Sequence, residues 1–298
     1  VEANTALEKG VGDFTVIAYA PVPVYPASSN RRTLVIGAAV IVLVLGWGIL
    51  LLIELLDLRI RSGREAAAAL GIRVLASLQR ADRRNLLPGI HGEVAHAEVY
   101  RILALKIRRS LSRPGERILI ASVIPDAGKS VVAANLASAW GRSDERVLVL
   151  DTETRRKVRP WALDALAADG LPSGLSDHLT FRAEGLGEIA HRSILPGVDL
   201  VGRGMEEALP EFLGSKRFAE LLGEASGAYG LVLIEAPAVR DNADAAIIGG
   251  LCNAVILVVR SRSVTPTAVS RALDELGRER VLGIIMTDVE KAFARRDE

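Results

Sequence analysis

The 298-residue chain has few of the residues on which several common classes of protein depend. Its single cysteine, Cys252, cannot form a disulfide within the chain, and the four histidines show no zinc-site spacing. Aromatic residues make up only 4% of the chain, so single-stranded nucleic acid would find few stacking platforms. The formal net charge of +1 gives no overall field that attracts nucleic acid. These absences exclude a disulfide scaffold and a zinc module, and we expect no nucleic-acid partner.

Apolar residues, in contrast, are abundant: 50% of the chain is hydrophobic, which excludes a disordered protein. The sequence TLVIGAAVIVLVLGWGILLLI at 33–53 contains no charge. A helix of that length spans about 30 Å, the thickness of the hydrocarbon core of a bilayer. A buried core helix would have a polar face, and a cleaved signal peptide would begin nearer the N-terminus. The sequence therefore predicts a transmembrane helix at 33–56.

Positive charge is distributed unequally around this helix. Two arginines lie just before it, and seven follow within about 30 residues: Arg59, Arg61, Arg64, Arg73, Arg80, Arg83 and Arg84. Because basic residues favour the cytoplasmic side, we expect residues 57–298 to be cytoplasmic. Residues 1–32, with the proline-containing stretch APVPVYP, would then lie on the outer side of the membrane. Since the chain starts at Val1, we expect it to be the end of a longer protein.

The cytoplasmic part divides by composition into a basic linker at 57–90 and a domain at 91–298. In this domain, runs rich in valine and isoleucine alternate with stretches that suit helices. Continuous apolar strands separated by helices indicate an α/β fold, with a parallel sheet covered by helices on both faces. The predicted strands are 117–123, 146–151, 231–235, 254–260 and 281–286, and the clearest helices 128–140, 216–226 and 265–276.

The first strong strand runs directly into Gly128-Lys129-Ser130, which opens a helix. This arrangement is typical of the end of a P-loop, where backbone N–H groups hold phosphate oxygens. The lysine would contact phosphates and the serine hydroxyl would bind Mg²⁺. The full pattern has a glycine where this chain has Val123, so an ordinary helix N-terminus is the alternative.

Two carboxylates stand at the ends of later predicted strands. VLVLD ends at Asp151, and LVLIE ends at Glu235. An acid after four apolar residues is costly to bury unless it is paired or bound to a cation. A helix cap or a salt bridge would explain either acid alone, but the three strand ends together favour a Mg²⁺–nucleotide site.

With these motifs in order, residues 121–290 resemble the cytoplasmic domain of the bacterial tyrosine kinases. The matching stretches are PDAGKS, the Walker A′ stretch VLVLDTETRR, the Walker B stretch GLVLIEAPA, and the shorter GLSDHL and LGIIMTDVE. The membrane half, ending in LLDLRIRS, is similar to the second transmembrane segment of the polysaccharide co-polymerases to which these kinases are fused. The resemblance implies a P-loop NTPase-like fold that binds ATP and Mg²⁺. It also implies that the membrane is a bacterial inner membrane, that residues 1–32 are periplasmic, and that the missing N-terminal part holds a first span and a periplasmic domain.

The resemblance also assigns residues. It implies catalytic roles for Asp151, Lys129 and Glu153, and Mg²⁺ ligands at Ser130, Asp151 and Glu235. Glu98 and Arg101 match the start of a helix motif through which these kinases form rings. The implied nucleotide-binding residues are Pro125, Asp126, Ala127, Gly128, Lys129, Ser130, Val131, Arg155 and Thr287.

Several positions depart from the family pattern. Asp126 replaces a loop glycine, and Glu153 and Glu235 each replace an aspartate, which moves the carboxylate by roughly 1.5 Å. Ala104 stands where the ring motif has its last arginine. The chain ends EKAFARRDE, without the tyrosine cluster that these kinases phosphorylate.

Two functions therefore stay open. The first is an ATP-dependent tyrosine autokinase that regulates exopolysaccharide or capsule polymerisation and export. The second is a catalytically degenerate scaffold or nucleotide sensor in the same system. In either case the expected partners are other copies of the chain, a polysaccharide polymerase and outer-membrane export proteins, and a partner kinase or tyrosine-tail protein is a further candidate. A membrane-anchored partitioning ATPase fits less well, because Ile124 stands where that group has its signature lysine.

Overall fold

The computed structural model describes residues 30–79, 94–111, 113–142, 145–153, 166–205, 210–241 and 243–290. The chain divides into two units, Val1–Asp57 and Leu58–Glu298. The predicted segment 1–32 lies almost wholly outside the described residues, as does part of the predicted linker.

Helix α2, Arg31–Leu56, is the described part of the first unit and contains the predicted apolar run. Among the described residues it is the one helix long and apolar enough to cross a membrane, with a hydropathy of 2.8 in its most apolar window. None of its residues is buried, which argues against a core helix. Its length and composition are compatible with a transmembrane segment.

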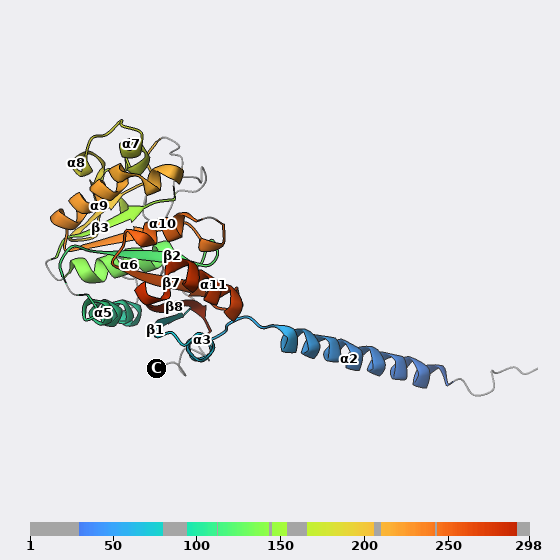
Figure 1. The fold of residues 1–298 in the computed structure, drawn as a ribbon. Coiled ribbons are helices and arrows are strands. Elements are labelled where there is room, and N and C mark those ends of the chain that lie inside the picture. The colour runs from blue at the N-terminus through green and yellow to red at the C-terminus, as the bar shows by residue number, and fades with distance from the viewer. Residues whose placement is uncertain are drawn as a thin grey trace, which may run out of the picture. The chain divides into compact units, whose positions relative to one another are not determined.

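In the second unit, the described residues form an eight-stranded sheet with the order β1-β8-β7-β2-β6-β3-β5-β4 (Figure 1). All neighbouring strands are parallel except β4 and β5. The α/β fold class predicted from the sequence is confirmed. The strands are β1 Val74–Gln79, β2 Glu116–Ser122, β3 Val147–Asp151, β4 His191–Arg192, β5 Val198–Val201, β6 Leu231–Glu235, β7 Ala254–Arg260 and β8 Val281–Val289.

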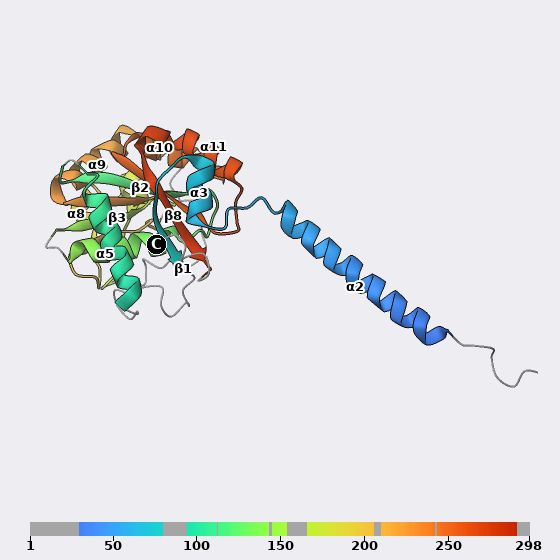
Figure 2. The ribbon, with the colours of Figure 1, turned by 90° about the horizontal axis from the view of Figure 1, so that it is seen from below.

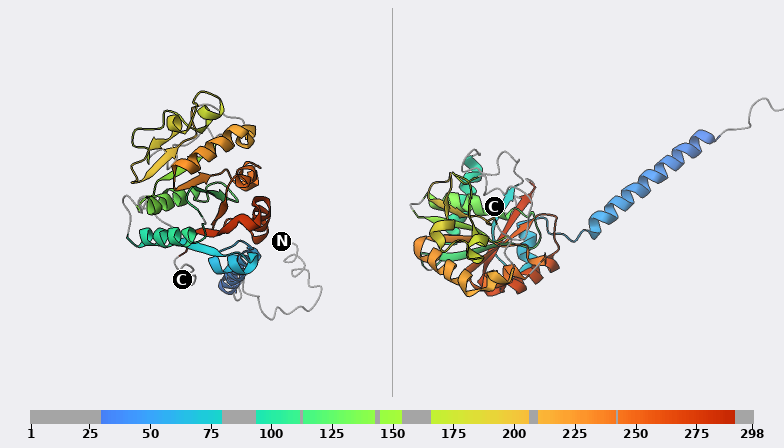
Figure 3. Two further views of the ribbon diagram at one scale, coloured as in Figure 1. Left: turned by 60° about the vertical axis from the view of Figure 1, so that its left-hand side comes forward. Right: turned by 90° about the horizontal axis from the view of Figure 1, so that it is seen from above.

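Helices cover both faces of this sheet (Figures 2 and 3). Side chains of each central strand alternate between two cores: in β2, Leu119 packs with one core and Ile118 and Ile120 with the other. Helices α5, Val94–Arg108, and α6, Lys129–Gly141, complete one core. The other core is completed by α3 Gly63–Leu70, α7 Leu175–Leu179, α8 Leu186–Ile189, α9 Lys216–Ala228, α10 Asp244–Gly250 and α11 Pro266–Leu276. Three short 3₁₀ helices are η3 Pro210–Gly214, η4 Val239–Asp241 and η5 Arg278–Arg280.

Part of the segment predicted as a basic linker is folded into this unit. Residues 58–79 include α3 and β1, and β1 pairs with β8. Ile60 is fully buried, and its N–H donates to the carbonyl of Val264 at 3.0 Å. As an edge strand with Leu75 as its one buried side chain, β1 lacks the continuous apolar run that marks the central strands. Residues 80–90 lie outside the described residues.

Candidate nucleotide-binding site

The predicted phosphate-binding loop connects the end of β2 to the start of α6. It contains two residues in the left-handed region, Asp126 with φ 55° and Gly128 with φ 91°. Asp126 thus adopts, in place of the glycine of the family pattern, a conformation that favours glycine. Aspartate is among the few other residues that enter this region readily. The loop therefore makes a left-handed turn at this position with an aspartate.

The loop is fastened from the other side by β8. The Thr287 hydroxyl donates to the carbonyl oxygen of Ala127 at 2.7 Å, and both residues are buried. Thr287, predicted as a nucleotide-binding residue, therefore contacts the loop itself. A buried carbonyl without a partner costs about 1–3 kcal/mol, so this hydrogen bond holds the loop against the sheet.

Lys129 lies at the first position of α6 and is buried. Its ammonium donates to the Ser122 hydroxyl at 3.1 Å, and that hydroxyl donates to the Ile124 carbonyl at 2.7 Å. The lysine charge is thereby held at the base of the loop. Together with the N-terminus of the 13-residue helix, it makes this end of the loop favourable for an anion.

The two predicted carboxylates are direct neighbours. Asp151 ends β3, Glu235 ends β6, and the two residues are paired across these parallel strands. Both are buried, and the Ser130 hydroxyl donates to Glu235 Oε1 at 2.8 Å. Glu235 Oε2 is buried without a hydrogen-bond partner. Burial, and next the negative charge of Asp151, raise the pKa of Glu235 to about 8. Two buried acids side by side create a demand for positive charge.

Arg203, which was not predicted from the sequence, supplies part of this positive charge. Arg203 Nε lies 2.8 Å from Asp151 Oδ2, while the Glu153 N–H donates to Asp151 Oδ1 at 2.8 Å. Arg203 follows β5, which ends near this edge of the sheet beside β3. The sequence signal was the Gly202-Arg203-Gly204 tripeptide directly after an apolar run, which places a cation between two conformationally free residues.

Thr152 fixes the two carboxylate-bearing strand ends to each other. Its N–H and its hydroxyl both donate to the Glu235 carbonyl oxygen, at 3.0 and 2.7 Å. The acids therefore share a rigid platform.

The described contacts bring Lys129, Ser130, Asp151, Glu235 and Thr287 to one edge of the sheet. Pro125 precedes the left-handed turn and Val131 lies in the first turn of α6. Glu153 contacts Asp151 through its backbone N–H. Arg155 lies outside the described residues. The functional roles assigned to these residues remain predictions.

The donor set at this edge fits Mg²⁺. Among the described residues there is no group of three or more His, Cys, Asp or Glu side chains that would hold a metal alone. Mg²⁺ characteristically takes one or two carboxylates and completes its shell with substrate phosphates and water. Asp151, Glu235 and the Ser130 hydroxyl supply such a partial shell, and Glu235 Oε2 still lacks a partner.

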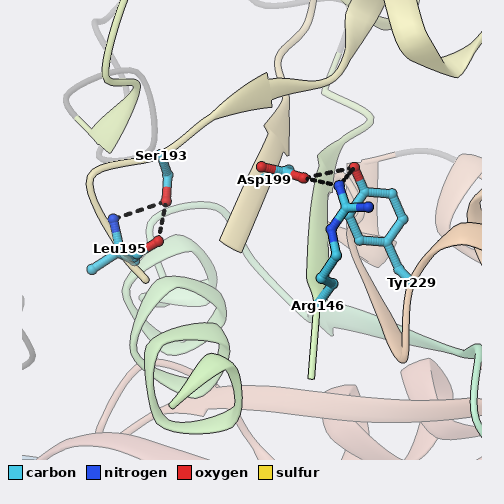
Figure 4. Close-up of polar contacts among 5 residues, drawn as sticks. All are labelled: Arg146, Ser193, Leu195, Asp199 and Tyr229. Atoms are coloured by element: carbon cyan, nitrogen blue, oxygen red, sulfur yellow. Dashed lines mark hydrogen bonds and ion pairs between the residues drawn. The ribbon is translucent and has the colours of Figure 1, made fainter. Parts of the chain in front are cut away.

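The two tyrosines in the described part of the chain are both buried. Figure 4 shows Tyr229 beneath Arg146, whose guanidinium lies 4.6 Å from the ring centroid. The Tyr229 hydroxyl donates to Asp199 Oδ2 at 2.9 Å. Arg146 and Tyr229 precede β3 and β6, at the edge opposite the carboxylates. Tyr100 packs in the core beneath α5. Neither tyrosine is presented for modification, while Tyr19 and Tyr25 lie outside the described residues.

Two residues of the predicted ring motif lie on the exposed side of α5. Glu98 and Arg101 form an ion pair at 3.4 Å, with side chains 50% and 71% exposed. Ala104, in contrast, faces the core. An arginine at that position would meet the α5–α6 packing, which gives a physical reason for the small residue there.

The fold and these contacts define a P-loop NTPase-like domain. No family model matches the chain. The chain is 32% identical over 175 residues to the tyrosine-protein kinase Wzc of Salmonella typhimurium, which covers 58% of this chain and 24% of that protein. It is 28% identical over 208 residues to the tyrosine-protein kinase YwqD of Bacillus subtilis, covering 68% and 86%.

Among solved structures, the kinase domain of the Escherichia coli tyrosine kinase ETK superposes with a TM-score of 0.65 at 24% identity, covering 76% of this chain and 94% of that domain. The resemblance to the bacterial tyrosine kinases is therefore confirmed in sequence and in fold. The chain spans about a quarter of the length of the Salmonella relative.

Proposed function

We propose that this chain is an inner-membrane component of an exopolysaccharide or capsule export system, and that its cytoplasmic domain is an ATP-dependent tyrosine kinase. One observation carries the proposal: two buried carboxylates, paired on neighbouring strand ends, lie beside a phosphate-binding loop with a buried lysine. Apolar side chains at these positions would stabilise the fold at least as well as buried charged groups do. A structural role therefore does not explain this arrangement. The kinase names of the relatives support the choice of reaction.

In the proposed reaction, the loop backbone and Lys129 bind the nucleotide phosphates. Ser130, Asp151 and Glu235 hold Mg²⁺, which when bound neutralises phosphate charge. Asp151 would also act as the base for the incoming tyrosine hydroxyl. Phosphoryl transfer requires mainly positioning and charge neutralisation, so a rigid platform of this kind is sufficient.

Two of the substitutions noted in the sequence are compatible with a working site. Asp126 adopts a left-handed conformation that favours glycine. The longer side chain of Glu235 is fixed by Ser130, so its carboxylate is ordered beside the loop. These contacts favour a working site over a degenerate one.

The substrate tyrosine, on this proposal, is supplied by another protein, because Tyr100 and Tyr229 are buried and the chain ends EKAFARRDE without a tyrosine. Helix α2 is proposed as the membrane anchor, with the arginines after it on the cytoplasmic side. Self-association through the exposed Glu98–Arg101 side of α5, and contacts with a polymerase and outer-membrane export proteins, belong to the same proposal.

The test is Mg²⁺-ATP binding by calorimetry to the chain in detergent micelles, with Lys129→Ala as the matched variant. Binding by the parent chain and its loss in the variant are expected. A second measurement follows transfer of radiolabelled phosphate to a tyrosine-rich peptide. Binding without transfer to any tyrosine would favour the scaffold or sensor, and absence of binding at millimolar nucleotide would refute the kinase.

A further inference from the structure

Both carboxylate oxygens of Asp151 are engaged by groups of the chain itself. Oδ1 accepts the Glu153 N–H, and Oδ2 pairs with Arg203 Nε at 2.8 Å. The aspartate side chain is 2% exposed and the arginine side chain 23%, so the ion pair is largely shielded from water. Removing the cation from such a pair leaves an uncompensated buried charge, which is strongly unfavourable.

The backbone that carries Arg203 is built to place it. A Cβ atom at Gly202 would lie 2.7 Å from Leu171 Cδ1, and one at Gly204 would lie 2.3 Å from Ser176 Oγ. Gly204 also has φ +93°, which favours glycine. Gly204 is therefore restricted to glycine, whereas a side chain at Gly202 would require only a shift of the end of the Leu171 side chain.

Helix α7 fastens the same loop by its first residues. The Leu175 N–H donates to the Gly202 carbonyl at 2.8 Å, and the Ser176 N–H donates to the Arg203 carbonyl at 2.7 Å. The buried Asp177 carboxylate accepts the N–H of Met205. The GLSDHL stretch, to which the proposed reaction assigns no role, thus anchors the arginine from the side.

From this geometry we propose that Arg203 is a positioning residue: it serves as the stand-in cation of Asp151 while the site holds no nucleotide, and it competes with Mg²⁺ for that carboxylate. The inference rests on the proposed function, of which it describes a regulation. A guanidinium beside the metal position repels a divalent cation, so the metal alone binds weakly. The phosphates that arrive with the metal offer the guanidinium a new anionic partner. Metal and nucleotide therefore bind in strong cooperation, and the coupling is reciprocal.

The experiment measures Mn²⁺ binding by electron paramagnetic resonance to the 298-residue chain in detergent micelles, with and without ADP. The variants are Arg203→Gln and Arg203→Lys. The control is Arg271→Gln, which removes an arginine from an exposed pair with Glu275. If the Asp151–Arg203 ion pair is formed in about nine-tenths of the nucleotide-free molecules, Arg203→Gln binds Mn²⁺ alone about tenfold more tightly than the parent chain. ADP then improves Mn²⁺ binding less than in the parent. Arg203→Lys gives an intermediate affinity, and the control is unchanged.

Suppose that Arg203→Gln binds Mn²⁺ alone no more tightly than the parent, while the parent binds Mn²⁺ with ADP. This result would refute the competition between Arg203 and the metal, but not the proposed nucleotide site. A parent chain that binds no Mn²⁺ even with ADP would refute the proposed function itself, and with it the proposed role of Arg203. Should Arg203→Gln fail to fold by circular dichroism, the affinity of Arg203→Lys decides: a value equal to that of the parent refutes the competition.

Discussion

Glu235 makes the stability of the metal-free protein depend on pH in an unusual direction. Its pKa is raised from an ordinary 4.5 to about 8, first by burial and then by the charge of Asp151. The folded state therefore holds a proton that the unfolded state has lost. A group of this kind contributes its full stability below about pH 4.5, and the contribution is lost as pH rises through about 8.

The size of the effect follows from the shift. Each pH unit between the two pKa values costs about 1.4 kcal/mol, so the whole window represents at most a few kcal/mol. For a domain of this size, that corresponds to a melting temperature lower by roughly 2–4 °C for each kcal/mol. The variant Glu235→Gln is neutral at every pH and keeps an acceptor oxygen for Ser130. We expect Glu235→Gln to lack this loss of stability with rising pH.

The assay is thermal unfolding of the chain in detergent with EDTA, from pH 5 to pH 9. The quantity of interest is the difference between the parent and Glu235→Gln, because other acids titrate in both. We expect Glu235→Gln to gain stability relative to the parent as pH rises, and Glu220→Gln, on the exposed side of α9, to follow the parent. A constant difference between parent and Glu235→Gln across the window would refute the reasoning.

Three further substitutions test other parts of the structure. Asp126→Gly removes an exposed negative charge beside the loop, and should tighten ADP binding by up to about fivefold at low salt and less at high salt, measured by calorimetry. Thr287→Val leaves the Ala127 carbonyl without its donor, and should cost about 1–3 kcal/mol of unfolding free energy and speed amide exchange in the loop. Leu75→Ala should cost about 2–5 kcal/mol if β1 belongs to the domain core, whereas Val99→Ala, half-exposed on α5, should cost little.

The central strands could be predicted from the sequence because each is buried on both faces. The expected strand at 231–235 coincides with β6, and the one at 254–260 coincides with β7. Continuous valine and isoleucine runs of this kind have few alternatives. Strands β1, β4 and β5 were not predicted, because they are short or lie at the edges of the sheet. Most side chains of β1 and β4 are not buried, so their apolar pattern is weak, while β5 is largely buried but has only four residues, one of which is Asp199.

The site was predictable where residues are consecutive and less so where they are brought together by folding. Lys129 and Ser130 could be predicted because they lie between a predicted strand and a predicted helix. Asp151 and Glu235 could be paired because parallel strands end at a common edge. Arg203 belongs to a loop whose position depends on α7 and on two glycines. No pattern in its own neighbourhood states that it reaches Asp151, since that contact spans 52 positions in the chain.

A residue that departs from a family pattern is weak evidence of lost function when the fold gives the new side chain a suitable conformation and position. At position 126 the loop has a left-handed backbone conformation that favours glycine, and Asp126 adopts it. At position 235 the carboxylate matters for its place beside the loop, and the hydrogen bond from Ser130 fixes the longer side chain there. The metal position is the remaining point of difference, because Mg²⁺ tolerates little error in ligand distance. The degenerate reading therefore depends on metal binding, which the Mn²⁺ measurements on the parent chain and the Arg203 variants test.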